Sequence, residues 1–191
     1  MRASKLVLIL GSAVAASSAF GQVDYDNLLA STSGNDPVAS FGPLYDSFSV
    51  GSTGVTVSSV LLNVFGGVDG NTFTVGIYSD NSTSPDALLN STVLPDGSGI
   101  VLANFGATAL APNTRYWIGL SSPTGGSDEF WNWSMDISGP GVAGEFFYNQ
   151  SGLFPNSDSP YQMLIASTPE PSSFAFLGLG VLPLFLRRRR K

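Results

Sequence analysis

The sequence predicts an all-β body, a β-sandwich of jelly-roll-like form, with a helical segment at each end of the chain. Short segments rich in Val, Ile, Phe, Tyr, Trp and Thr recur along the 191 residues. Turn clusters of Gly, Pro, Asn, Asp and Ser separate them at near-regular intervals, which is typical of sandwiches and barrels. The body also lacks any amphipathic helix pattern longer than two turns.

The N-terminal segment, residues 1–21, has the layout of a secretory signal peptide. Arg2 and Lys5 precede an apolar run over 6–16, and small residues follow it. This run is too short for a lasting transmembrane helix. We expect cleavage after Gly21, which leaves Gln22 as the mature N-terminus; cleavage after Ala19 and an uncleaved anchor are the alternatives.

The β domain is expected over residues 22–168. Its expected strands are 39–50, 55–65, 72–78, 88–94, 100–105, 115–120, 129–135, 144–148 and 161–166. In 72–78, Phe73, Val75 and Ile77 alternate onto one face, which predicts a sheet with one packed side. In 55–65, apolar residues occupy both parities, so we expect this strand to be apolar on both faces near its end.

Several motifs along this domain carry a resemblance. They are Asp26-Asn27-Leu28, Tyr45-Asp46-Ser47-Phe48-Ser49-Val50, Val57-Ser58-Ser59-Val60, Phe73-Thr74-Val75-Gly76-Ile77-Tyr78-Ser79-Asp80, Leu110-Ala111-Pro112-Asn113-Thr114-Arg115-Tyr116-Trp117-Ile118 and Tyr161-Gln162-Met163-Leu164. The series resembles the choice-of-anchor domains, type R in particular, which are exported β domains found with different C-terminal sorting signals. The resemblance implies a β-sandwich with a surface role, and it brings no catalytic residues to transfer.

The C-terminal segment, residues 169–191, has three parts in a fixed order. Pro169, Glu170 and Pro171 come first, an apolar run over 174–186 follows, and Arg187, Arg188, Arg189, Arg190 and Lys191 close the chain. As a helix, residues 172–186 reach about 22 Å, short of a hydrocarbon core of roughly 30 Å. The basic cluster is expected to stay on the cytoplasmic side as a membrane stop. These features predict that the segment is a temporary membrane anchor.

This layout resembles the PEP-CTERM sorting signal of Gram-negative bacteria that make extracellular polysaccharide. The resemblance implies two partners, the export machinery and an exosortase-like membrane protease that cuts at Pro169-Glu170-Pro171. It implies a transient stay in the inner membrane and a final place at the cell surface, in the envelope or in the extracellular matrix of a biofilm. The alternative is an ordinary tail anchor that stays in the inner membrane.

The net charge of the body limits the classes of molecule that it can bind. All 14 acidic residues lie between Asp24 and Glu170, and Arg115 is the only basic residue in that interval. A net charge of about −13 repels phosphate backbones, which excludes nucleic acid as a partner. It is compatible with metal cations and with hydrated extracellular polysaccharide.

The absence of cysteine and histidine limits the reactions that the protein could catalyse and the metals that it could bind. It removes Cys and His nucleophiles, His general bases and the usual zinc ligands. No G-x-S-x-G motif is present either. Paired carboxylates, such as Glu129 with Asp136, are a route to glycoside cleavage that needs no His. We expect a protein without catalytic residues.

Two tryptophans offer a candidate carbohydrate site. Trp131 and Trp133 stand two apart on an expected strand, so both indoles project from one face. Flat aromatic rings stack on sugars, with Asp128, Glu129 or Asn132 as hydrogen-bonding partners. The alternative is that one or both fill the core.

Four aspartates are candidate Ca²⁺ ligands, because Ca²⁺ prefers oxygen. They are Asp24, Asp26, Asp69 and Asp80. None belongs to an EF-hand pattern, and solvated turns are the alternative. No other cofactor is expected. The sequence as a whole predicts an exported, non-catalytic surface or matrix protein with a structural or adhesive role, the alternative being a carbohydrate-binding module that uses Trp131 and Trp133.

Overall fold

The computed structural model describes residues 22–67, 70–82, 84–122, 128–149 and 158–169. Apart from one four-residue helix, every regular element among these residues is a β-strand, which confirms the predicted all-β class. The elements are β1 (Gln22–Asp26), β2 (Gly34–Pro37), α1 (Val38–Phe41), β3 (Leu44–Ser49), β4 (Val55–Phe65), β5 (Thr72–Asp80), β6 (Pro85–Pro95), β7 (Gly99–Leu110), β8 (Arg115–Ser121), β9 (Phe130–Trp133), β10 (Phe147–Asn149) and β11 (Met163–Pro169). The predicted signal peptide and the chain from Glu170 onward lie outside the described residues. Within the described part, no helix is long and apolar enough to cross a membrane.

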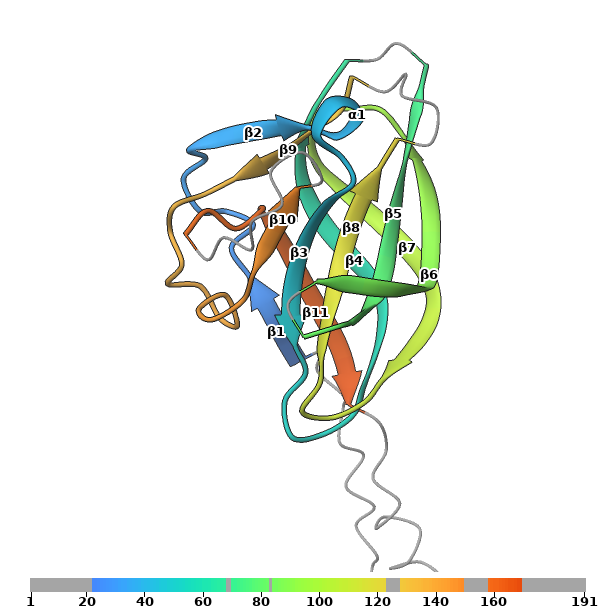
Figure 1. Ribbon diagram of the computed structural model, residues 1–191, viewed down its shortest axis with the longest axis vertical. Helices are drawn as coiled ribbons and strands as arrows, with labels where there is room; N and C mark the ends of the chain where they lie inside the picture. Colours follow the sequence, from blue (N-terminus) through green and yellow to red (C-terminus); the bar gives the residue numbers. More distant parts are fainter. Residues whose placement is uncertain (1–21, 68–69, 83, 123–127, 150–157, 170–191) are drawn as a thin grey trace, which may run out of the picture.

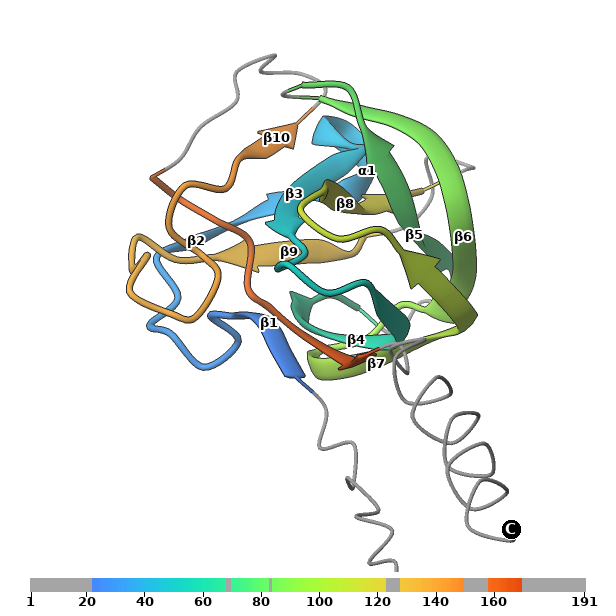
Figure 2. The same ribbon diagram turned by 90° about the horizontal axis from the view of Figure 1, so that it is seen from below.

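The strands form two antiparallel sheets, which lie on opposite sides of the body (Figures 1 and 2). The six-stranded sheet has the order β1-β11-β4-β9-β2, and β7 pairs with β4 as well. Because β7 and β11 pair with the same residues of β4, they occupy opposite edges of that strand. β9 pairs with β4 only at Val64 and Phe65, which lie past the last residue of β4 that pairs with β11, and it pairs with β2 on its other edge. The five-stranded sheet has the order β10-β3-β8-β5-β6.

One hydrophobic core joins the inner faces of the two sheets. The expected alternation in β5 is confirmed, since Phe73, Val75 and Ile77 are all fully buried. Phe48 on β3 and Ile118 on β8 belong to the same cluster as Val57 on β4 and Ile165 on β11. The body therefore depends on apolar packing, and the chain has no cysteine to supplement it.

The expectation that β4 is apolar on both faces near its end is confirmed, because Leu61 and Phe65 lie opposite the buried face, but only one of the two apolar faces is buried. Val55 and Val57 are buried at one parity, and Val60, Leu62 and Val64 are buried at the other. The register of β4 against β7 shifts between Val57 and Ser59, which moves every later side chain to the opposite face. A strand with two apolar parities thus keeps a single buried face.

Three local expectations also differ from the structure. Residues 39–50 were expected to be one strand, but 39–41 belong to α1 and the strand begins at Leu44. This helical turn takes the chain from β2 in one sheet to β3 in the other, and Gly42 N donates to Val38 O at its end. β1 and β2 were not predicted. The sequence of β2, Gly-Asn-Asp-Pro, has no strand pattern, and it pairs only along β9.

The two ends of the described chain lie side by side. In β1 and β11, Gln22 is the register partner of Ser167, and Pro169 at the end of β11 is opposite Val55. Figure 1 places these strand ends at the bottom of the body, with α1 at the top. Segments that precede Gln22 and follow Pro169 are therefore joined to the same end of the body.

Candidate functional site

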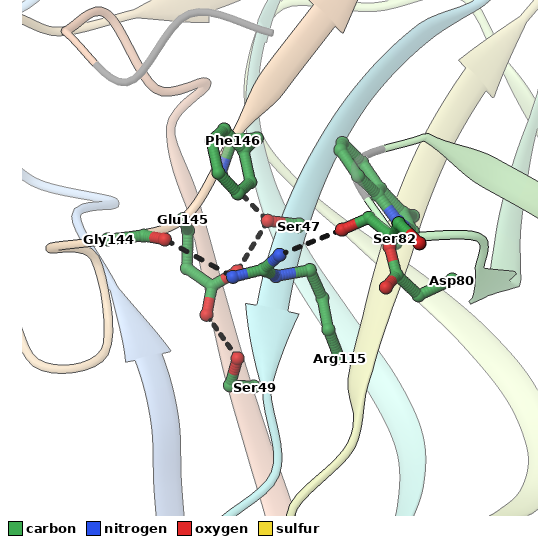
Figure 3. Close-up of polar contacts among 9 residues, drawn as sticks. Ser47, Ser49, Asp80, Ser82, Arg115, Gly144, Glu145 and Phe146 are labelled. Atoms are coloured by element: carbon green, nitrogen blue, oxygen red, sulfur yellow. Dashed lines mark hydrogen bonds and ion pairs between the residues drawn. The ribbon is translucent and has the colours of Figure 1, made fainter.

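The outer face of the five-stranded sheet carries the most connected group of charged side chains in the described residues. β8 alternates in the ordinary way, so Tyr116 and Ile118 enter the core while Arg115 and Trp117 project outward. Arg115 is the only basic residue between Asp24 and Glu170. Its partners come from the segment before β10 and from Ser82, between β5 and β6, as Figure 3 shows.

Each of the three nitrogens of the Arg115 guanidinium donates a hydrogen bond. Its Nε donates to Oε2 of Glu145 at 3.0 Å in an ion pair. Its Nη1 donates to Ser82 O and its Nη2 to Gly144 O, each at 3.3 Å. The guanidinium carbon also lies 4.6 Å from the ring centroid of Phe146, within the range of a cation–π contact.

Glu145 is the centre of a second set of bonds. The hydroxyls of Ser47 and Ser49 on β3 donate to its two carboxylate oxygens. The amide of Phe146 donates to Oγ of Ser47 at 2.8 Å, and the amide of Ser47 donates back to Phe146 O at 2.8 Å. The side chain of Glu145 is 6% exposed and that of Arg115 is 24% exposed. The polar cluster of Arg115, Glu145, Ser47 and Ser49 is hereafter called the Arg115 cluster.

The chemistry open to the Arg115 cluster is limited because its charged groups are bonded to one another and to neighbouring groups of the protein. The carboxylate accepts from Ser47, Ser49 and Arg115, and the guanidinium donates to three separate acceptors. Ser47 is fully buried, so its hydroxyl has no open side for a substrate. The arrangement therefore holds residues 144–146 against β3 and β8.

Trp117 is placed beside this cluster. It is fully buried on the outer side of β8, and its Nε1 donates to Oδ1 of Asp80 at 2.7 Å. Asp80, a predicted Ca²⁺ ligand, thus accepts a hydrogen bond from a buried indole.

A buried carboxyl occupies the inner side of β3. Asp46 Oδ2 accepts from the Tyr161 amide at 2.6 Å and from the Tyr25 hydroxyl at 3.2 Å. Burial raises the pKa of Asp46 well above its ordinary value, and the bonds from Tyr161 and Tyr25 oppose that rise only in part. Burial, together with the negative charge of Asp46, also raises the pKa of Tyr25. Tyr161 continues the network, since its hydroxyl donates to Asp36 Oδ2 at 2.6 Å.

The two tryptophans of the candidate carbohydrate site face the core. Trp131 is 0% exposed, stacks on Tyr161 with ring centroids 4.5 Å apart, and donates from Nε1 to Gln162 O at 3.1 Å. Trp133 is partly buried against the core, and its ring covers Gly34, where a Cβ atom would come within 2.4 Å of it. The pair does share a face, as expected, but that face is the packed one. Trp131 has no free ring surface for a sugar.

The candidate Ca²⁺ ligands are distributed over the fold. Asp24 and Asp26 lie on β1 of one sheet and Asp80 on β5 of the other, while Asp69 lies outside the described residues. Asp24 is nearly buried and accepts from Gln22 Nε2 at 3.0 Å; burial raises its pKa. Among the described residues, no three His, Cys, Asp or Glu side chains form a group that could hold a metal.

A pocket of about 280 Å³ opens beside the end of β1. Asp26, Asn27 and Leu29 line it from one side and Asp136, Ser138 and Gly139 from the other. Each aspartate has one oxygen occupied by a nearby amide, Leu28 N on Asp26 and Ser138 N on Asp136. The bonds from Ser138 lower the pKa of Asp136. The pocket therefore presents negative charge.

Of the predicted sorting residues, only Pro169 belongs to the described part, as the last residue of β11. Glu170, Pro171 and the basic residues 187–191 lie outside it. Comparison with known proteins adds no assignment, since no family model and no curated protein matches the chain.

The Arg115 cluster was not found from the sequence. Its members come from β3, β8 and the segment before β10, and the sequence separates Ser47 from Glu145 by 98 positions. One signal for it was present. A lone cation among 14 acidic residues is surrounded by candidate ion-pair partners, although the sequence does not indicate which one it contacts.

Proposed function

We propose that this chain is an exported, non-catalytic surface or matrix protein with a structural or adhesive role, processed by an exosortase-like protease. In this proposal the signal peptide directs export, and the C-terminal segment holds the protein in the inner membrane. Cleavage at Pro169-Glu170-Pro171 then releases the body to the envelope or the extracellular polysaccharide of a Gram-negative bacterium.

One observation carries the proposal. Gln22 and Ser167 are register partners, so both predicted targeting segments attach at one end of the body. A body tethered there keeps its opposite end, which includes α1, directed away from the membrane. Because β11 ends at Pro169, the first residue of the predicted cleavage motif is itself the last residue of the folded domain.

The form of the body fits this role. Two antiparallel sheets with a shared core support its description as a β-sandwich of the jelly-roll type, as the choice-of-anchor resemblance implies. The bonding within the Arg115 cluster, which joins residues 144–146 to β3 and β8, supports a structural role for this polar group. Burial of Trp131 removes the basis of the carbohydrate-binding alternative, so an adhesive role must rest on another surface.

The intact mass of the protein from the native envelope and medium tests the proposal. We expect a polypeptide that begins near Gln22 and ends near Glu170 or Pro171, with or without an added mass. A product that keeps Arg187 to Lys191 would refute processing and leave a tail-anchored protein.

A matched pair of variants assigns the cleavage to its motif. Glu170→Gln should accumulate the uncut form, because it removes the one charge of the tripeptide. Ser172→Ala, two residues further on, should be processed as before. Equal processing of both variants would contradict recognition of the tripeptide.

A further inference from the structure

The outer face of the six-stranded sheet carries exposed apolar side chains. Phe65 is 56% exposed, Ile100 52% and Leu102 47%. Leu61 on β4 is the register partner of Leu102 on β7 and of Leu164 on β11, so these three residues form a row across the sheet. Asn63, the register partner of Ile100, lies between Leu61 and Phe65 and is hydrogen-bonded to Asn132 and Gln162, so the apolar side chains surround one bonded polar group.

Phe130 extends this surface from β9. It is the register partner of Phe65, and the two ring centroids lie 6.1 Å apart. The surface formed by Leu61, Phe65, Ile100, Leu102, Phe130 and Leu164 is hereafter called the apolar face. Scattered apolar residues are ordinary on protein surfaces, whereas contiguous ones mark a contact with another molecule.

The distribution of charge indicates what that molecule is. β4, β7, β9 and β11 contain no charged residue, although the chain has 14 acidic residues. Bodies with a net charge of about −13 repel one another at most orientations. Two copies can approach most closely through a surface that carries no charge.

We propose that two copies of this chain pack against each other through the apolar face. A two-fold axis makes one patch complementary to itself, and sheets stacked face to face lie about 10 Å apart. A lipid surface fits less well, because anionic membranes repel an acidic body and Arg115 lies on the other sheet. The pairing goes beyond the proposed function and does not depend on C-terminal processing.

Disulfide cross-linking of the full chain tests the pairing directly, since the chain contains no cysteine of its own. Leu61→Cys, Phe65→Cys, Ile100→Cys and Leu102→Cys are purified separately in mild detergent and oxidised. Val93→Cys on β6 is the matched control, because Val93 is 61% exposed but lies on the other sheet. Disulfides need Cβ atoms about 4 Å apart, so positions near the two-fold axis should form covalent dimers. We expect at least one apolar-face position to exceed the control at least about tenfold.

A charge placed on the apolar face gives the second test. Of Leu61→Cys, Phe65→Cys and Ile100→Cys, the variant that gives the most covalent dimer is combined with Leu102→Asp. The added aspartate should lower the dimer yield at least about tenfold, because it brings like charges together. Val93→Asp should leave the yield unchanged. Near-native tryptophan fluorescence shows that both variants remain folded.

Three results would overturn the pairing: no dimer at any of the four positions, equal dimer in the Val93→Cys control, or a yield indifferent to Leu102→Asp. Protection of the thiols by phosphatidylcholine vesicles without covalent dimer would also overturn it and point to lipid. The intact-mass measurement is independent of these results, so processing and pairing can fail separately.

Discussion

Arg115 and Glu145 form a partly buried ion pair although 30 positions separate them in the sequence, and their Nε and Oε2 atoms lie 3.0 Å apart. The pair joins β8 to the segment that leads into β10. Four further bonds, from Ser47 and Ser49 to the carboxylate and from the guanidinium to Ser82 O and Gly144 O, fix its geometry (Figure 3).

Removing the cation should destabilise the protein. Arg115→Met leaves Glu145 nearly buried without a countercharge, and we expect a loss of about 2 to 3 kcal/mol in the free energy of unfolding. Urea unfolding followed by tryptophan fluorescence measures it. The double variant Arg115→Met with Glu145→Gln should recover part of the loss, because it also removes the unpaired charge. A single variant as stable as the unmodified protein would contradict a stabilising role.

Asp46 should make stability depend on pH. Burial raises its pKa well above the ordinary value of 3.8, so the folded protein keeps a proton that the unfolded chain releases. The stability contributed by the neutral carboxyl is complete below pH 3.8 and is lost as the pH rises from there through the folded pKa. We expect the free energy of unfolding to fall across that window, and to fall less steeply in Asp46→Asn.

Urea unfolding at stepwise pH measures this slope. Asp86→Asn, a change at an exposed position on β6, is the control and should keep the original slope. The same slope in Asp46→Asn and in the unmodified protein would assign the pH dependence to other groups.

Trp131 should be far more important for stability than an exposed aromatic on the same sheet. Trp131→Ala removes a fully buried indole that stacks on Tyr161, and we expect it to cost about 3 to 5 kcal/mol. Phe65→Ala, on the opposite face, should change the free energy of unfolding by less than about 1 kcal/mol. Thermal unfolding by circular dichroism compares them. Similar effects would contradict the assignment of faces.

Gly119 should tolerate no side chain. A Cβ atom there would lie 2.5 Å from the Tyr45 ring and 2.7 Å from the Tyr78 ring, which form an edge-to-face pair. We expect Gly119→Ala to destabilise the protein by about 1 to 3 kcal/mol. Gly106→Ala is the matched control, because its nearest neighbour would be an ordinary 3.7 Å away. Unfolding midpoints in urea distinguish the two variants.

The strands that could be predicted are those whose own residues favour β structure. The expected bounds of 55–65 agree with β4, because β-branched and aromatic residues fill it between two glycine-containing turns. Its buried face could not be predicted, since the register shift after Val57 depends on pairing with β7. β2 could not be predicted at all, because a Gly-Asn-Asp-Pro segment becomes a strand only along β9.

The candidate sites also include features that the local sequence predicts and features that depend on contacts between distant segments. The alternation of Trp131 and Trp133 correctly placed both on one face, but alternation does not reveal which face is packed. The Arg115 cluster depends on the close approach of three segments distant in sequence. Only the rarity of positive charge in the body pointed to Arg115 beforehand.

The position of β11 between β1 and β4 has a mechanical consequence. Ladder hydrogen bonds run perpendicular to the strands, and β11 has them along both edges. A tension applied to the chain beyond Pro169 runs along this strand, so it loads both ladders in shear instead of unzipping them one bond at a time. A tether attached beyond Pro169 would therefore pull on a strand that is hydrogen-bonded along both edges.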